Sequence, residues 1–305
     1  MPTEIKFFDR FDQSEKNEQI YGDGAVRFFY ENPIGKILSS IISLKIVSYL
    51  YGLTQDSASS AKKIPNFIKK FKINMDEYLG GSNSSQEKED SYKSFNEFFI
   101  RKFKDGKRDF DQDKTQLPAF CEARYFGYNS LDSNSKFPVK GNLWNAKSVL
   151  QRNDLNEIFE NGPALIARLC PVDYHRYHYP DDGKNLESYF IRGPLHSVNP
   201  LALNVRPKIL MENERRVSIL ETENFGKLAF VEVGATCVGR IVQSHDENIE
   251  FKRAQEKGYF LFGGSTVIVF GQKGKWEISE DIRTNTLQGR EVLVRLGQAV
   301  AIAKS

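Results

Sequence analysis

The 305-residue sequence has only three cysteines and four histidines, and its most apolar segment is interrupted by serine and lysine. The cysteines, Cys121, Cys170 and Cys237, are widely spaced and form no CxxC pair. This spacing predicts neither a disulfide framework nor a zinc finger. We therefore expect the protein to work in a reducing compartment.

Several other features are missing, and each absence argues against a kind of partner, targeting signal or chemistry. The net charge is only +3, and no dense Lys/Arg stripe interleaved with aromatics is present, so we expect no nucleic-acid partner. The charged N-terminus has no apolar segment behind a basic start, which argues against a cleaved secretory signal. No glycine-rich phosphate loop lies between a strand and a helix, which argues against nucleotide chemistry.

The most apolar stretch runs from Pro33 to Leu53, and its apolar residues recur with a helical period. Serines and Lys45 in its middle argue against a helix that spans a bilayer. Between Lys36 and Lys72 there are seven lysines and a single acid, Asp56. An apolar face with excess lysine favours an anionic membrane surface, whereas a helix packed on the core with solvated lysines explains the pattern equally well. Both interpretations remain open at this point.

The rest of the chain divides into a polar segment, a short helix and a β-rich part. Residues 80–92 are small, polar and charged, which is typical of an exposed loop or a domain edge. Ser94 followed by Glu97 predicts a capping box that starts a short helix with phenylalanines turned inward. From Leu117 onward, short β-prone runs separated by Gly, Pro, Asn and Asp predict mainly sheet.

Two of the four histidines, His175 and His178, lie three residues apart in the polar segment LCPVDYHRYHYP. Histidine titrates near neutral pH, so such a pair could divide the roles of base and acid. Without further context, a structural pair hydrogen-bonded in a turn is the more common explanation. A metal site lacks a third ligand at recognisable spacing.

The segment FGGSTVIVF, residues 262–270, interrupts a β-prone run with two glycines and two hydroxyls. Taken alone, it predicts a turn or a bulge. The functional interpretation is a strained Gly264–Ser265 bond, in which the serine hydroxyl attacks the glycine carbonyl to form an ester. Elimination of that ester and hydrolysis of the resulting dehydroalanine would leave a pyruvoyl group. This chemistry requires an activated hydroxyl and a nearby base.

Several motifs of the sequence resemble those of a known family. DYHRYHYP, GPLHSVNPLAL, NERRV, FGKLAFVEVGATCVG and EKGYFLFGGSTVIVF occur in the order expected of the pyruvoyl-dependent phosphatidylserine decarboxylases. Upstream, GKILSSIIS, KINMDEY and SFNEFFIRKFKDGKRDF are similar to the bacterial subgroup whose processing sequence is GGST. The resemblance covers nearly the whole chain.

The resemblance implies a role for particular residues. Ser265 would become the pyruvoyl group, with cleavage between Gly264 and Ser265 into a β chain of residues 1–264 and an α chain of residues 265–305. His178 resembles the histidine of the Asp/His/Ser relay that drives self-cleavage, and His175 the histidine that handles protons during decarboxylation. The substrate amine would form a Schiff base with the pyruvoyl carbonyl, so neither pyridoxal phosphate nor a metal is expected. The product would be phosphatidylethanolamine.

One position departs from the family pattern. The family has an aspartate where the best alignment places Glu122, beside Cys121. A glutamate can orient and charge-stabilise a histidine, but its side chain is one methylene longer. An ordinary surface carboxylate is the alternative for Glu122, and Cys170, where the family more often has alanine, is expected to be a small core residue. His196 and His245 are expected to be structural.

The resemblance implies an α+β fold: helices in residues 1–110 that associate with a membrane, then a largely antiparallel β catalytic domain in residues 111–305. Expected partners are phosphatidylserine, an anionic membrane surface, the chain's own α and β fragments and, as an option, a second copy in a homodimer. The expected location is peripheral, on the cytoplasmic face of the cell membrane. Two rival functions remain: a soluble amino-acid decarboxylase on the same scaffold, and a lipid-binding paralogue that Glu122 has left unable to cleave itself.

Overall fold

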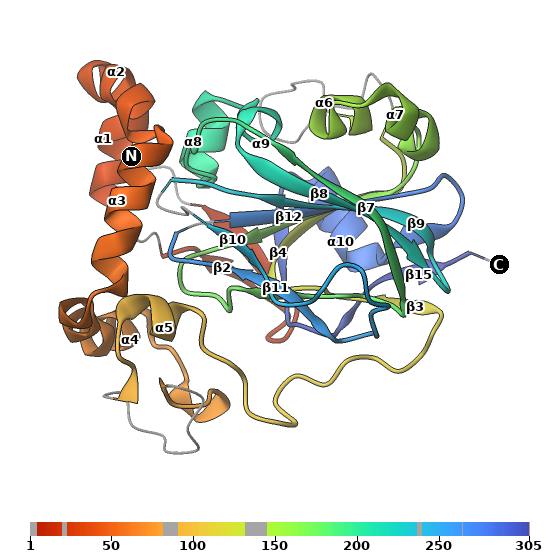
Figure 1. Ribbon diagram of the computed structural model, residues 1–305, viewed down its shortest axis with the longest axis horizontal. Helices are drawn as coiled ribbons and strands as arrows, with labels where there is room; N and C mark the ends of the chain where they lie inside the picture. The colour runs from red at the N-terminus through yellow and green to blue at the C-terminus, as the bar shows by residue number, and fades with distance from the viewer. Residues whose placement is uncertain are drawn as a thin grey trace.

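A large sheet forms the centre of the molecule, with the N-terminal helices gathered at one end of it (Figure 1). The computed structural model describes residues 5–19, 23–81, 91–131, 145–236, 240–263 and 265–304. Most of the polar segment expected as a loop, Cys237 and Gly264 lie outside the described residues. The architecture is α+β with largely antiparallel sheets, which confirms the expected fold class at that level.

The large sheet has nine strands in the order β2-β1-β14-β4-β5-β12-β9-β8-β7. Within the described residues its pairings are antiparallel, apart from the parallel pair β1–β14. Its strands are β1 (Lys6–Asp9), β2 (Ser14–Asn17), β4 (Ala123–Tyr128), β5 (Ala164–Leu169), β7 (Gly183–Ile191), β8 (Arg215–Thr222), β9 (Gly226–Val233), β12 (Ser265–Gly271) and β14 (Glu291–Val294).

Two three-stranded sheets accompany the large one, in the orders β10-β11-β6 and β13-β15-β3. Their strands are β3 (Gln116–Pro118), β6 (Arg176–His178), β10 (Ile241–Gln243), β11 (Glu256–Phe260), β13 (Trp276–Ile278) and β15 (Ala299–Ala303). The helices beside the sheets are α6 (Ala146–Leu150), α7 (Asn153–Phe159), α8 (Pro200–Val205), α9 (Ile209–Glu212) and α10 (Glu280–Leu287).

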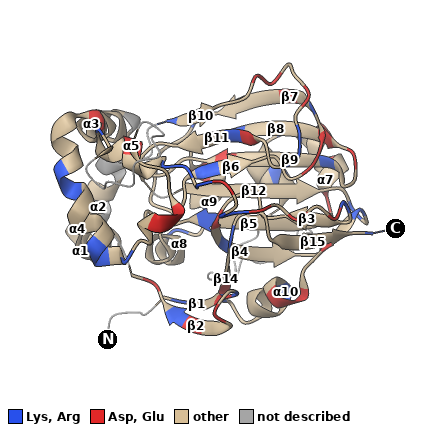
Figure 2. Cartoon of the chain, turned by 90° about the horizontal axis from the view of Figure 1, so that it is seen from below, with Lys and Arg blue, Asp and Glu red and all other residues tan. Residues whose placement is uncertain are grey.

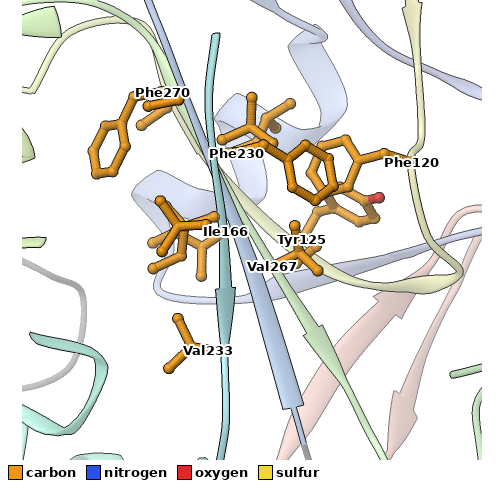
Figure 3. Close-up of a cluster of buried hydrophobic side chains, with 14 of the residues drawn as sticks. Phe120, Tyr125, Ile166, Phe230, Val233, Val267 and Phe270 are labelled. Atoms are coloured by element: carbon orange, nitrogen blue, oxygen red, sulfur yellow. The ribbon is translucent and has the colours of Figure 1, made fainter. Parts of the chain in front are cut away.

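β12 is the strand that positions the expected processing site. Each of its seven residues is buried, and it pairs with β5 on one side and β9 on the other. Its run of β-branched and aromatic side chains suits a strand covered on both faces. Figure 3 shows Val267 of β12 within the cluster of Phe120, Tyr125 and Phe230. The ring of Phe230 also lies 6.0 Å from that of Tyr177 on β6, so the sheet containing β6 packs on the large sheet.

The N-terminal helices stand together as a column at one end of the molecule (Figure 1). They are α1 (Asp23–Glu31), α2 (Pro33–Ile42), α3 (Lys45–Asp56), α4 (Ile64–Phe71) and α5 (Phe95–Phe99), with 3-10 turns at Ala58–Lys63 and Met75–Glu77. None of the helices within the described ranges has both the length and the apolar character that crossing a bilayer requires.

The single helix expected from Pro33 to Leu53 is in fact two, α2 and α3. Leu44 between them has extended backbone, with φ −65° and ψ 135°. The carbonyl of Ser43 accepts a hydrogen bond of 2.9 Å from the Leu195 N–H, so tertiary contact holds the break in place. Helical periodicity continues through such a break, because side-chain spacing alone does not show where a carbonyl changes partner.

The expected helix after Ser94 is present as α5. The Ser94 hydroxyl accepts from the Glu97 N–H at 3.1 Å, whereas the Glu97 carboxylate accepts from the Lys93 N–H rather than from that of Ser94. Phe95, Phe98 and Phe99 are buried, as the pattern predicted.

The N-terminal hairpin β1–β2 was not predicted. It lies before residue 110, yet it joins the large sheet through β14. This hairpin connects the two sides of the domain boundary expected at residue 110. The boundary itself stays a prediction.

Candidate active site

Ser265 is the first residue of β12, and it is fully buried. It lies opposite Leu169, the last residue of β5. Gly264, the other half of the expected cleavage site, lies outside the described residues. Gly263 has a φ of 141°, a backbone conformation that residues other than glycine rarely adopt. The chain therefore makes a glycine-dependent turn just before the strand begins.

The structure brings His175 to Ser265. The Ser265 Oγ lies 3.4 Å from the His175 Nδ1, at the long end of hydrogen-bond range, and neither residue is exposed to solvent. The other ring nitrogen, Nε2, lies 2.8 Å from the carbonyl oxygen of Cys170. A carbonyl only accepts, so Nε2 must carry the proton that it donates. Nδ1 is then left with a lone pair that faces the serine hydroxyl, which is the arrangement of a base.

The surroundings of His175 keep its ring neutral. Its ring stacks on that of Phe99, with centroids 3.8 Å apart and an interplanar angle of 24°. Burial lowers the pKa of His175 to about 3, and the Cys170 carbonyl only partly opposes this. At neutral pH the imidazole is therefore unprotonated and free to accept a proton from Ser265.

A buried network of charges fixes the loop that carries this carbonyl. The Cys170 N–H donates to the Asp173 carboxylate at 2.7 Å, and Arg124 donates to the same carboxylate oxygen at 2.6 Å. Arg124 and Arg168 both bind Glu18, which reaches them from the N-terminal hairpin. Burial raises the pKa of Asp173 to about 6 despite the charge of Arg124. The network holds the Cys170 carbonyl against His175 and so fixes the tautomer of the ring.

Sequence reasoning did not find this network. Its one signal was an arginine, Arg168, inside the apolar run ALIARL of β5. A buried cation within an apolar strand requires a carboxylate partner. Nothing in the sequence pattern indicates that the partner would be Glu18, 150 residues away.

His178 has different neighbours. Its Nε2 lies 3.2 Å from the Tyr174 hydroxyl, and its Nδ1 lies 2.8 Å from the Ala254 carbonyl oxygen. Across the described residues, His178 makes no hydrogen bond with Ser265 or with Glu122. Its role in self-cleavage stays a prediction that rests on the family resemblance.

Glu122 is bound to an arginine rather than to a histidine. Its carboxylate accepts two hydrogen bonds from Arg108, at 2.5 and 3.0 Å, and Arg108 also binds Glu77. The Leu296 N–H lies 3.3 Å from the same carboxylate. The expected role of Glu122 in orienting a histidine likewise stays a prediction.

The other two histidines have partners other than Ser265. The Nδ1 of His245 lies 3.3 Å from the Tyr179 hydroxyl, and His196 is held through its backbone by Asn213. In the part of the chain that the structure describes, His, Cys, Asp and Glu residues form no group of three placed to hold a metal.

A largely apolar cavity of about 380 Å³ lies beside the serine. It reaches Phe262 and Gly263 just before Ser265, and Leu169 and Cys170 at the end of β5. Side chains from α1, α2 and α3 line its other side, among them Phe29, Ser39, Val47 and Tyr51. The cavity therefore connects the candidate site with the helical column.

Comparisons with known proteins identify the family. Residues 95–302 match the family model described as phosphatidylserine decarboxylase. Proteins named phosphatidylserine decarboxylase proenzyme are similar over almost their whole length. The one from Clostridium botulinum (strain Alaska E43 / Type E3) is 37% identical over 97% of this chain and 98% of its own. Those from Clostridium novyi and Clostridium tetani are 39% and 38% identical, with the same 97% of this chain covered.

These matches confirm the expected activity, the decarboxylation of phosphatidylserine to phosphatidylethanolamine, and they favour neither rival function. The name proenzyme in the relatives agrees with the expected zymogen character. The chain belongs to the phosphatidylserine decarboxylase family of carboxy-lyases.

Proposed function

We propose that this decarboxylase is made as a proenzyme that cleaves itself between Gly264 and Ser265, and that residue 265 then carries the pyruvoyl group used on phosphatidylserine. One observation carries the proposal. A fully buried serine hydroxyl lies 3.4 Å from the unprotonated nitrogen of a neutral histidine, beside an apolar cavity.

The cleavage chemistry follows from these groups. The Ser265 Oγ attacks the carbonyl carbon of Gly264 while His175 Nδ1 takes the hydroxyl proton. The peptide C–N bond breaks, which leaves an ester and a free amine on residue 265. Loss of the α-proton of residue 265 then expels the Gly264 carboxylate. Addition of one water releases ammonia and leaves a ketone at residue 265.

The family resemblance assigns the first proton transfer to His178, oriented by Glu122. The contacts of the described residues favour His175 instead, because His178 and Glu122 are occupied by Tyr174 and Arg108. We propose that His175 handles the proton in self-cleavage as well as in decarboxylation. The cleavage rates of His175→Gln and His178→Gln distinguish the roles of the two histidines.

The surroundings of Ser265 suit a pyruvoyl group. A ketone carries no charge, so its burial between Leu169 and His175 costs far less than that of an ionised group. When present, the group would supply an electron-withdrawing carbonyl for the departing carboxylate. The Nδ1 of His175, which carries no proton in the neutral ring, would accept one beside residue 265, and the apolar cavity would exclude bulk water from it.

The proposed test is the intact mass of the small fragment from the wild-type protein. A fragment of residues 265–305, 41 residues long, should appear on a denaturing gel. Its mass should be lower than that of the serine form by one molecule of ammonia, because the ketone replaces the amine. A free serine at its N-terminus, or one band that persists after long incubation, would contradict the proposal.

We also propose that the helical column docks on an anionic membrane at the cytoplasmic face of the cell membrane. Large apolar side chains are exposed along it, with exposed fractions between 38% and 66%: Phe28, Ile34, Leu38, Leu44, Ile46, Tyr49, Leu50 and Leu53. In Figure 2 these helices are predominantly tan. Exposed lysines follow on the adjoining segment, at residues 62, 63, 69, 70 and 72. An apolar patch bordered by lysines is typical of binding to anionic lipid.

Changing Ile46 and Leu50 to glutamate should abolish this docking. Each apolar side chain that loses its burial costs about 1.5–3 kcal/mol, so the pair should weaken binding on the order of a hundredfold or more. Flotation with phosphatidylserine-containing vesicles measures the effect. Leu186 and Phe190 on β7 are similarly exposed, at 43% and 46%, and their change to glutamate is the matched control. Equal binding of both variants would contradict the docking proposal and favour a soluble enzyme.

The homodimer is an expectation from the sequence. Light scattering gives the molar mass of the processed protein and so distinguishes a monomer from a dimer.

A further inference from the structure

The turn that precedes the expected cleavage site is held by one buried side chain from a distant helix. Asn96, in α5, is 3% exposed. Its Oδ1 accepts a hydrogen bond of 2.9 Å from the Phe262 N–H, and its Nδ2 donates one of 2.7 Å to the Asp56 carboxylate. A backbone N–H only donates and a carboxylate only accepts, so the two partners fix which way the amide points.

Asp56 is itself anchored. It is the last residue of α3, and its second carboxylate oxygen accepts from Arg240 at 3.1 Å. The side chain of Asn96 therefore bridges the end of α3 and the backbone of residue 262. No part of this bridge takes part in the proposed chemistry at Ser265 and His175.

The ring of Phe262 is packed in the same place. Its centroid lies 5.0 Å from those of Phe95 and Phe99 and 5.9 Å from that of Tyr51. Such packing restrains the position of the ring, but it is not directional and does not fix the rotation of the backbone. The hydrogen bond from the Phe262 N–H does fix it, because the donor must point at Oδ1.

Orientation is what self-cleavage needs most. The serine side of the bond is fixed by the pairing of β12 with β5 and β9. The other side enters through residues 262 and 263, outside any strand. Attack on a carbonyl requires the reacting atoms to be aligned about 3–3.5 Å apart, and a displacement of about 1 Å can cost a hundredfold in rate.

We propose that Asn96 is a positioning residue for self-cleavage, and that Asp56 orients its amide. This inference rests on the proposed self-cleavage at Ser265. Once the chain is cut, residues 262–264 end the β chain and no longer need to present a carbonyl to the serine. Asn96 is therefore important for making the active enzyme and much less so for its turnover.

The test compares cleavage with turnover in the full-length chain. Asn96→Ala should slow the appearance of the 41-residue fragment by at least tenfold in a time course after synthesis. Decarboxylation per mole of pyruvoyl, counted by reductive trapping with labelled amine, should stay within about threefold of wild type. A structural defect alone would lower both quantities together.

An exchange of the two partners provides a rescue. Asn96→Asp alone places two carboxylates side by side and should cleave slowly. Asn96→Asp combined with Asp56→Asn restores one donor and one acceptor with the bridge reversed, so cleavage should return to within a few fold of wild type. The surface ion pair with Arg240 is lost in the double variant, but such exposed pairs contribute little.

Glu97→Ala is the matched control, because it weakens the start of α5 and leaves both hydrogen bonds of Asn96 intact. The inference would be overturned if Asn96→Ala cleaved at the wild-type rate or if Glu97→Ala slowed cleavage equally. It would also be overturned if the double variant did not recover the cleavage rate. The absence of any fragment from the wild-type chain would instead refute the proposed self-cleavage itself. The two failures are therefore distinguishable.

Discussion

Replacing Ser265 by alanine is expected to leave a single 305-residue polypeptide with no decarboxylase activity. The change removes the only atom that can attack the Gly264 carbonyl in the proposed reaction, and with it the source of the pyruvoyl group. Alanine fits the buried position because it is smaller than serine. A denaturing gel and the release of CO₂ from phosphatidylserine measure the two losses in one preparation.

Thr266→Val is the matched control for this experiment. Thr266 is the adjacent residue of β12 and is almost fully buried, and its hydroxyl has no hydrogen-bond partner among the described residues. Valine has nearly the same shape, so removal of an unsatisfied buried hydroxyl should cost little or nothing. Fragment and activity should both persist in Thr266→Val. Activity that survives in Ser265→Ala would refute the assignment of the pyruvoyl to residue 265.

The second large effect is expected at His175. His175→Gln should slow cleavage by about 10²–10⁴-fold, the usual contribution of a general base, and should also impair decarboxylation in any processed fraction. His178→Gln should slow cleavage less than tenfold, since the contacts it disturbs, with Tyr174, Phe110 and the Ala254 carbonyl, do not include Ser265. A time course of fragment formation for both variants gives the comparison.

The reverse result would have a clear meaning. If His178→Gln blocks cleavage while His175→Gln does not, the relay implied by the family resemblance is correct and Ser265 exchanges partners before it reacts.

The pH dependence of cleavage adds an independent check on His175. Because burial lowers its pKa to about 3, the base form persists on acidification. Protonation of His175 should therefore not slow cleavage between pH 8 and pH 5. A histidine with the ordinary pKa of about 6.5 would lose about 30-fold over the same range.

Much of the fold could be predicted because its signals are local. The hydroxyl of Ser94 caps α5 as expected, and the apolar run after Ser265 forms the buried strand β12. The N-terminal hairpin escaped prediction because its strands carry a weak pattern, and their place in the sheet depends on parallel pairing with β14, near the other end of the chain. Short sequence windows contain no information about such a partner.

The candidate site was predictable in its parts but not in its pairing. His175 and His178 were both found, yet their spacing of three suggests neighbours only if the segment is helical. In this structure residues 176–178 form β6, and the Phe260 N–H continues its pairing to the carbonyl of His175. Residues three apart on an extended chain point to opposite faces, so the two rings have different surroundings.

The strand order has a consequence for the cleaved protein. β12 lies between β5 and β9, and β14 lies between β1 and β4, so residues from 265 onward are inserted at two interior places of a sheet otherwise built by residues before 264. The small fragment cannot dissociate unless the backbone hydrogen bonds on both sides of each of these strands break. It also could not insert into a sheet that the other strands had already formed. The uncut chain is then the form in which assembly must finish, and the cut yields two polypeptides that stay interlocked.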